Sequence, residues 1–364
     1  MRVLFIYKFL TTGGVETVLR ARMDALKELG VDCDIWFLEA VDGHAVFRGV
    51  EAELYFGDQS KLSSHLRKRS YDTISVIDTP EVLLLLQQLI YSPRILIEAH
   101  TPYLENLEYV RQLESKDASL IVVPSDHQFQ LVQKRLNSPI PMMMLPNPLS
   151  TKFVSEPTNF RPIPPRPIVG WVGRLDGLKN WRLAIKTTSV LRKREWDVEL
   201  WIAGRLTERA TANQLYRAAQ SAGILDRLKW FENLPHHRMH LWLDAVRLSG
   251  GVVLATSKGE SFGMSVAEAM ARRCPVVVPD ASPFVEFISH DREGKLYEHN
   301  SPRRAATQIE GFLLDQDLRS SCGFRARERI LADHHPKQAN SRWVDTVTDL
   351  QLIPAGPSLF SFRP

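Results

Sequence analysis

This 364-residue sequence lacks several features that define common classes of protein. No stretch approaches the roughly 18 consecutive apolar residues that span a bilayer, because the longest apolar run covers only residues 82–86. Cysteine is scarce, and Cys33, Cys274 and Cys322 stand too far apart to form a pair at metal-ligand spacing. The first ten residues are too short for a signal peptide and lack a small-residue cleavage site. These absences predict a cytoplasmic protein, with peripheral contact at the inner face of a membrane left open.

Dense clusters of basic residues are also missing. The longest basic run is Arg67-Lys68-Arg69, so the sequence does not predict a nucleic-acid partner. The net charge of +4 is unevenly distributed, because residues 1–165 hold 17 Lys and Arg against 20 Asp and Glu, whereas the remainder holds 29 against 22. A basic second half favours an anionic ligand such as a diphosphate.

Short apolar segments alternate with longer amphipathic segments along most of the chain, which predicts parallel sheets with crossover helices. The expected strands cover residues 3–7, 34–37, 73–77, 95–98, 120–123, 142–145, 168–172, 199–203, 228–231, 251–255 and 275–278. The expected helices cover residues 14–29, 60–69, 81–90, 104–115, 126–136, 180–192, 210–222, 236–245, 264–272, 302–314, 317–331 and 337–352.

A proline-rich segment interrupts this alternation. Residues 157–167 hold five prolines and therefore read as a stiff connector. We predict an α/β protein with two facing Rossmann-like parallel-sheet domains, at 1–156 and 168–335, followed by a helix at 336–352 and a loose tail at 353–364. Ligands bind beyond the carboxyl ends of such strands, so we expect chemistry in the cleft between the domains.

The most specific motif is SKGESFGMSVAEAM, residues 257–270, which follows an apolar strand. Glu260 falls in the loop, and Glu268 on the first turns of the next helix. The amides of residues 262–264 would lie at the N-terminus of that helix, where unpaired N–H groups and the dipole favour a phosphate. Carboxylates suit sugar hydroxyls because each can accept several hydrogen bonds. A plain strand-to-helix turn with a capping carboxylate is the alternative.

A second motif, VGWVGRLDGLKN, opens the second half at residues 169–180. Arg174 and Lys179 flank a short loop that begins where Gly173 ends a strand. Two cations at the carboxyl end of a strand can clamp a pyrophosphate. An ordinary basic surface loop is equally compatible with this motif taken alone.

Two weaker signals lie in the first half. Gly13-Gly14 stands between the first strand and a helix, a turn that suits phosphate, but the sequence contains neither G-x-G-x-x-G nor G-x-x-x-x-G-K. Glu16 fits the first turn of that helix through its charge alone. His100 ends an apolar strand, which would place it in the cleft, although a lone histidine is more often a structural hydrogen-bonding group.

Taken in order, Gly-Gly-Val-Glu, His100, Gly-Arg…Lys and Glu-Ser-Phe-Gly-Met…Glu resemble the family 4 retaining glycosyltransferases of the GT-B architecture. The resemblance covers nearly the whole chain and is supported by VVPSD at 122–126 and LPNPL at 145–149. It implies transfer of a hexose-type sugar from a nucleotide-diphosphate donor, with retention and without a metal or other cofactor. The acceptor could be a saccharide, a lipid-linked molecule, a protein or a small metabolite.

The resemblance also implies a role for each matching residue. Arg174 and Lys179 would bind the diphosphate, Glu268 the ribose, and His100 would face the sugar or the reaction centre. Trp343 would lie in a last helix that crosses back to the first domain. The implied catalytic residues are Glu260, His100, Arg174 and Lys179. The implied donor-site residues are Gly14, Gly173, Arg174, Lys179, Gly204, Asn233, Leu234, Glu260, Ser261, Phe262, Gly263, Met264 and Glu268.

The sequence departs from the family pattern at three places. The glycine-rich turn after the second strand of the second half reads Ala203-Gly204-Arg205-Leu206, with an added cation. The segment before the connector has Asn147-Pro148 in place of the usual Asn-Gly. The segment that would meet the base, 231–234, lacks the usual glycine, so the identity of the base is open.

Other functions remain compatible with the sequence. A metal-dependent transferase would use Asp-x-Asp, which Asp32-Cys33-Asp34 matches, but this motif stands at the start of a strand and therefore at the wrong edge of a Rossmann sheet. A nucleotide-sugar epimerase or a phosphorylase could use the same architecture. A non-catalytic partner subunit of a transferase could also retain the donor fold.

Overall fold

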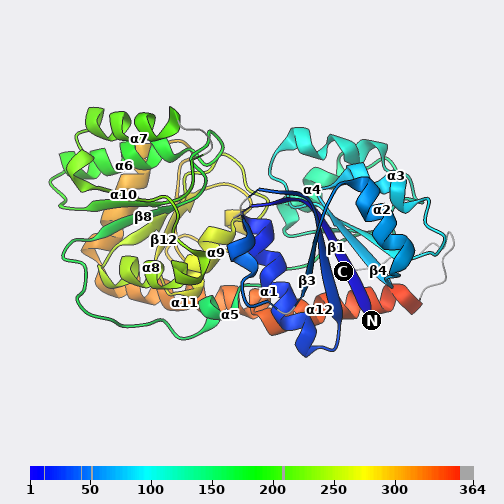
Figure 1. Cartoon of the computed structure of the whole chain (residues 1–364). Helices are drawn as coiled ribbons and strands as arrows, with labels where there is room; N and C mark the ends of the chain where they lie inside the picture. The colour runs from blue at the N-terminus through cyan, green and yellow to red at the C-terminus, as the bar shows by residue number, and fades with distance from the viewer. Residues whose placement is uncertain (12, 42, 51, 207–209, 353–364) are drawn as a thin grey trace.

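The computed structural model describes residues 1–11, 13–41, 43–50, 52–206 and 210–352, which form two α/β domains side by side (Figure 1). The predicted tail at 353–364 lies outside the described residues. Every strand pairs in parallel with its neighbours, so the carboxyl ends of the strands in each sheet meet at one edge. Among the described residues, no helix combines the length and the apolar character that crossing a bilayer requires.

The first domain contains a seven-stranded sheet in the order β3-β2-β1-β4-β5-β6-β7. Its strands are apolar and deeply buried at the centre, where every residue of β4 is buried. The strands are β1 Arg2–Leu10, β2 Asp32–Ala40, β3 Glu53–Phe56, β4 Thr73–Ile77, β5 Arg94–Glu98, β6 Leu120–Val123 and β7 Met142–Met144. The α-helices are α1 Gly14–Glu28, α2 Gln59–Lys68, α3 Leu83–Leu86, α4 Asp126–Gln133 and α5 Thr151–Val154.

Three segments of this domain differ from the sequence-based expectation. Strand β3 was not predicted, because none of its four residues at the edge of the sheet is buried and Glu53 is exposed. The helix expected at 81–90 is shorter, consisting of the 3₁₀ turn η2 Pro80–Val82 followed by α3. The helix expected at 104–115 is the 3₁₀ helix η3 Leu104–Gln112, since its apolar residues recur every third position, which matches three residues per turn.

The second domain contains a six-stranded sheet in the order β10-β9-β8-β11-β12-β13. Only the three-residue strand β13 was missed by the sequence pattern. The strands are β8 Ile168–Val172, β9 Glu199–Ala203, β10 Leu228–Phe231, β11 Val252–Leu254, β12 Val276–Pro279 and β13 Lys295–Tyr297. The α-helices are α6 Trp181–Lys193, α7 Ala210–Ser221, α8 His236–Leu248, α9 Met264–Ala271, α10 Pro302–Leu314 and α11 Gln316–His334.

The last helix, α12 Pro336–Leu352, follows α11 but packs against α1 of the first domain (Figure 1). Trp343 of α12 is buried in the core of that domain, and its ring centroid lies 5.3 Å from that of Phe5 in β1. The first domain is therefore completed by a segment from the end of the described chain.

Direct contacts also join the two sets of loops at the carboxyl edges. The Ser125 hydroxyl donates a 2.5 Å hydrogen bond to the carbonyl oxygen of Ser261. The Glu286 carboxylate accepts hydrogen bonds from the amides of Asp126 and His127, at 3.0 and 2.9 Å, at the start of α4. These bonds hold the edges of both sheets close to each other.

Candidate active site in the interdomain cleft

A cleft of about 1410 Å³ lies between the carboxyl edges of the two sheets. It is lined by loops that follow the strands of both domains, as expected for open parallel sheets. The predicted site residues that line it are Gly14, His100, Gly173, Arg174, Lys179, Gly204, Asn233, Leu234, Glu260, Ser261, Gly263, Met264 and Glu268.

Lys179 and Glu260 form an ion pair in the wall of the second domain. Lys179 precedes α6, Glu260 follows β11, and the distance from Nζ to Oε1 is 2.5 Å. The same oxygen accepts a 2.7 Å hydrogen bond from the Ser257 hydroxyl. The Lys179 side chain keeps 19% of its surface exposed and borders the cleft, while the pair keeps it in place.

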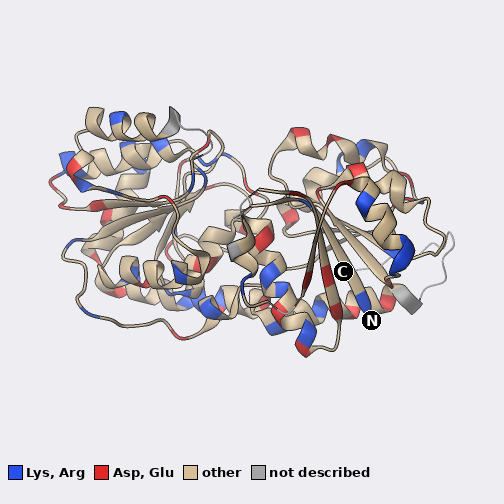
Figure 2. Cartoon of the chain, in the orientation of Figure 1, with Lys and Arg blue, Asp and Glu red and all other residues tan. Residues whose placement is uncertain are grey.

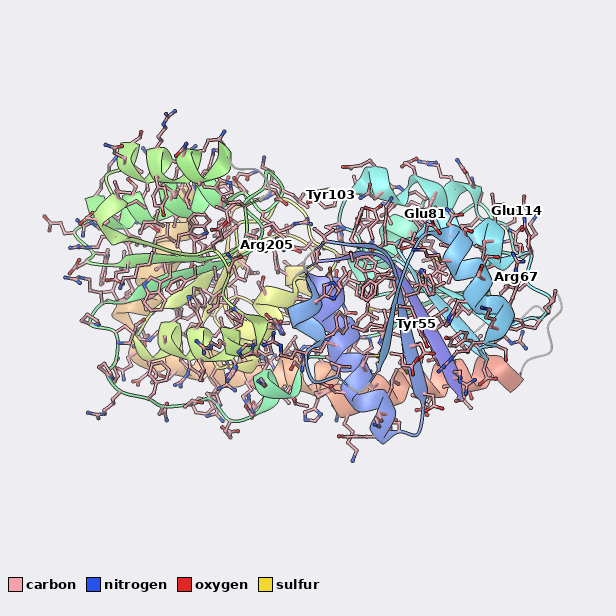
Figure 3. All side chains as sticks on the ribbon, in the orientation of Figure 1. Tyr55, Arg67, Glu81, Tyr103, Glu114 and Arg205 are labelled. Atoms are coloured by element: carbon pink, nitrogen blue, oxygen red, sulfur yellow. The ribbon has the colours of Figure 1, made fainter. Side chains whose placement is uncertain are left out.

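Arg174 reaches across the cleft to the first domain. Its Nη2 donates a 2.5 Å hydrogen bond to the Tyr103 hydroxyl, and its Nε lies 3.3 Å from Asp176 Oδ2. The Tyr103 hydroxyl in turn donates to Asp176 Oδ2 at 3.1 Å. Figure 3 shows Tyr103 on the first domain, near the gap between the domains. The sequence analysis did not identify Tyr103, and the only signal available was its position shortly after His100.

The loops after β8 and β9 touch where both contain glycine. A Cβ atom on Gly204 would lie 1.8 Å from the carbonyl oxygen of Gly173, so any side chain at Gly204 would force these loops apart. The next residue, Arg205, lines the cleft from the second domain (Figure 3). Arg205, the added cation noted in the sequence analysis, therefore lines the cleft.

Helix α9 begins at the cleft with a left-handed residue. Gly263 is its N-cap with φ of 102°, and a Cβ atom there would lie 2.8 Å from the ring of Phe284. The first amides of a helix have no partner within the helix, so they are suited to an anion. Phe262 does not line the cleft with its side chain, which is buried against Phe287 and His334 at centroid distances of 5.2 and 4.5 Å.

Glu268 lies one helical turn further along α9. It is buried, and its Oε1 lies 3.2 Å from Nε2 of His236, the first residue of α8. Asn233 and Leu234 precede His236 and line the same wall. A ligand with hydroxyl groups could bind the remaining carboxylate oxygen of Glu268.

His100 belongs to a buried charge network of the first domain. Its Nε2 lies 2.9 Å from Glu98 Oε2, and Arg22 Nη1 bonds both oxygens of Glu98 at 2.6 and 2.9 Å. The Ser75 hydroxyl and the Trp343 indole donate to Glu98 Oε1 at 2.7 and 3.3 Å. Burial alone would raise the pKa of Glu98, but Arg22 and His100 hold this pKa well below its usual value. The network fixes the ring of His100 and leaves Nδ1 for a ligand.

Asp78 is a second titratable group at this edge that the sequence analysis did not identify. It follows β4, lines the cleft and has a left-handed φ of 41°. Its two carboxylate oxygens lie 3.1 and 3.2 Å from the amide of His100. Burial raises the pKa of Asp78 to about 6. Like His100, Asp78 comes just after a strand. This position was the signal in the sequence that could have identified Asp78 as a cleft residue.

The N-terminus of α1 faces α9 across the cleft. A Cβ atom on Gly14 would lie 3.9 Å from Met264 Cγ. Glu16 turns back to accept hydrogen bonds from the amides of Gly13 and Thr11, at 3.1 and 2.7 Å. Glu16 therefore caps the N-terminus of α1. This agrees with the sequence-based expectation that Glu16 fits the first turn of that helix.

The Asp-x-Asp motif lies away from the cleft. Asp32, the first residue of β2, lies opposite Arg2 of β1 in the register of the sheet. The carboxylate of Asp34 accepts a 2.7 Å hydrogen bond from the Tyr71 hydroxyl and lies 2.9 Å from the Arg69 guanidinium. Within the part of the chain that the structure describes, no group of three or more His, Cys, Asp or Glu side chains is arranged to hold a metal ion.

Comparison with known proteins finds sequence matches mainly in the second half of the chain. Residues 157–329 match the family model described as "Glycosyl transferases group 1". The chain is 26% identical over 173 residues to the lipopolysaccharide core biosynthesis mannosyltransferase LpcC of Rhizobium leguminosarum, a match that covers 47% of each protein. It is 29% identical over 166 residues to the D-inositol 3-phosphate glycosyltransferase of Paenarthrobacter aurescens, covering 45% of this chain and 38% of that protein. The matches thus span about half or less of these relatives.

Solved structures match over more of the chain. The structure of Anabaena Alr3699/HepE in complex with UDP and glucose aligns with a TM-score of 0.82 and 17% identity, covering 96% of this chain and 100% of that one. TarM aligns with a TM-score of 0.79 and 12% identity, covering 95% and 98%. The chain therefore has the GT-B fold, and its second domain matches the group 1 glycosyltransferases.

Proposed function

We propose that this protein is a retaining glycosyltransferase of family 4, which moves a hexose-type sugar from a nucleotide-diphosphate donor to an acceptor hydroxyl. The observation that carries the proposal is the meeting of Lys179, Glu260 and the N-terminus of α9 at one edge of the second sheet. The second domain matches a glycosyltransferase family model, and HepE, which has the same fold, has been solved with UDP-glucose.

Arg174 and Lys179 would stabilise the leaving diphosphate. Negative charge develops on this group as its bond to the sugar breaks, so fixed cations there stabilise the transition state more than the ground state. Each charged hydrogen bond contributes about 1.5–3 kcal/mol. Glu268 would hold the ribose hydroxyls, and Glu260 and His100 would contact the transferred sugar from opposite walls.

Retention would follow from attack on the same face that the diphosphate leaves. The proton of the acceptor hydroxyl would pass to the leaving phosphate, and no metal or other cofactor would take part. In support of same-face attack, Glu260 Oε1 already bonds Lys179 and Ser257, which makes this oxygen a poor nucleophile for a covalent intermediate. Proton NMR of the product would reveal its anomeric configuration, and inversion would contradict this mechanism.

The direct test is calorimetric titration with UDP, GDP, ADP and dTDP in the presence of EDTA. We expect one nucleotide to bind in the micromolar range and Lys179→Ala to weaken it. The control, Lys186→Ala, removes the same charge from an exposed position on α6. If none of the four binds, with or without magnesium, the chain is instead a partner subunit without a donor site.

The kinetic test uses Arg174→Ala. Loss of one charged contact to the leaving group should lower kcat/KM by roughly 10- to 150-fold. Steady-state rates with the donor found by calorimetry measure this effect, and Lys186→Ala serves again as the control. Unchanged activity of Arg174→Ala would rule out the diphosphate clamp.

A further inference from the structure

A second group of basic side chains, apart from Arg174 and Lys179, lines the cleft. Its members are Arg20 of α1, Arg48 just after η1 Gly43–Phe47, Lys152 of α5 and His237 of α8, and all four line the cleft. Arg20 and Arg48 belong to the first domain, and α5 packs against α8 of the second. Figure 2 shows basic segments on both α1 and α8. The proposed transfer reaction gives none of these four side chains a role.

Two anchors hold the members of this cationic cluster. The Arg20 guanidinium donates from Nη1 to the carbonyl oxygens of Val46 and Arg48, the latter at 3.2 Å, which fixes η1 beside α1. On the other side, the Phe153 ring lies 5.2 Å from the His236 ring, between centroids. Lys152 precedes Phe153 in the chain, and His237 follows His236. The contact between the two rings therefore restrains the backbone at both basic residues.

The charges of the cluster act on one another across the cleft. Partial desolvation lowers the pKa of His237, and the cations Lys152, Arg238, Arg20 and Arg48 lower this pKa further. Like charges that repel in this way favour a bound anion.

Acidic side chains do little to neutralise the cluster. Asp24 also lines the cleft, but its Oδ2 lies 4.0 Å from Arg20 Nε, one helical turn away, and such i,i+4 pairs are weak. Among the described residues, Arg48, Lys152 and Arg238 form no ion pair with an acidic side chain. The cluster thus presents several cations that lack an acidic partner in the described part of the chain.

We propose that Arg20, Arg48, Lys152 and His237 form a second anion site, which binds a phosphate group between the two domains. Guanidinium groups and ammonium groups are the usual partners of phosphate oxygens. The phosphate could be carried by a soluble ester or by a lipid headgroup, and both present the same oxygens to the cluster. The proposal rests on the geometry of the cleft and does not depend on the sugar-transfer reaction.

The test must separate this site from Arg174 and Lys179, the proposed diphosphate clamp. Binding of glycerol phosphate is therefore measured in the double variant Arg174→Gln/Lys179→Gln. We expect binding to persist there and to weaken about tenfold or more when Arg48→Gln and Lys152→Gln are added. The matched control adds Lys186→Gln and Lys193→Gln, which remove two exposed cations from α6. All four positions are exposed, so the variants should fold, as circular dichroism and thermal melting would verify.

Two results would overturn the proposal: no saturable binding of glycerol phosphate in the clamp variant, or equal weakening in the matched control. A second arm identifies the source of the phosphate by sedimentation with vesicles of phosphatidylglycerol and phosphatidylcholine. Co-sedimentation that depends on Arg48 and Lys152 would assign the site to a lipid headgroup. Binding of glycerol phosphate without co-sedimentation would assign it to a soluble ester.

Discussion

The two walls of the cleft use charged residues in opposite ways. In the first domain, Arg22 and Glu98 are almost completely buried, with side-chain exposures of 2% and 0%, and bond each other. In the second domain, Arg174 is 51% exposed and Lys179 is 19% exposed. Charges that are buried and ion-paired cannot change partners without a large cost, whereas more exposed charges can. The first wall is thus a fixed scaffold for His100, and the second can exchange its internal partners for a ligand.

The largest expected effect comes from breaking the buried wall. Arg22→Leu would leave Glu98 buried without its main counter-charge, so we expect the free energy of unfolding to fall by about 3–5 kcal/mol. Urea denaturation followed by circular dichroism measures this loss. Lys186→Leu, at an exposed position on α6, should change stability by less than about 0.5 kcal/mol. A similar small effect for Arg22→Leu would contradict the contrast between the two walls.

A medium effect should appear in the pH dependence of stability. Burial raises the pKa of Asp78 to about 6, so between about pH 4 and 6 the folded protein retains a proton that the unfolded chain releases. Asp78 therefore contributes stability that is fully present below about pH 4 and is lost as the pH rises through about 6, by about 3 kcal/mol.

Replacing Asp78 by asparagine should remove this contribution to the pH dependence. Unfolding free energies of Asp78→Asn and of the wild type, measured from pH 4 to 7, should converge at low pH and separate at neutral pH, with the variant relatively more stable there. Asp345→Asn, on the exposed face of α12, provides the control. Parallel curves for Asp78→Asn and the wild type would show that Asp78 titrates normally.

The smallest effect tests whether the second wall can exchange partners. Tyr103→Phe removes the hydroxyl that bonds Arg174 Nη2. A bound diphosphate would compete with this hydroxyl for Arg174, so the variant should bind the nucleotide diphosphate about 2- to 10-fold more tightly, which corresponds to one neutral or charge-assisted hydrogen bond. Calorimetry measures the change, and weaker binding would instead make Tyr103 part of the donor site.

Much of the fold follows from local pattern. The strands at 73–77, 120–123, 168–172, 199–203 and 228–231 coincide with the observed β4, β6, β8, β9 and β10, because each is a short segment in which apolar residues predominate. Strands β3 and β13 were not predicted, because each has only three or four residues and these show no clear alternation of buried and exposed side chains. Tertiary pairing with a neighbouring strand forms them, and a single sequence does not encode that pairing locally.

The site was predictable as a set of positions but not as a set of contacts. Residues that follow strands, such as His100 and Arg174, can be placed at the cleft from topology alone, and their chemical roles remain predictions. The partners of these residues are far away in the chain: Tyr103 and Arg174 are separated by 71 positions, and Glu98 and Trp343 by 245. Glu98 was hidden inside a predicted strand, where its charge gave no sign of the network around it.

The return of α12 to the first domain has a consequence for biosynthesis. The last strand of the first sheet ends at Met144, but Trp343, which packs on Phe5 and bonds Glu98, belongs to a helix that begins at Pro336. At synthesis rates of about 5–20 residues per second, roughly 10–40 s separate the two segments. During that interval the nascent first domain carries Arg22 and Glu98 without their indole cover, so this domain reaches its final packing only after the second domain has been synthesised.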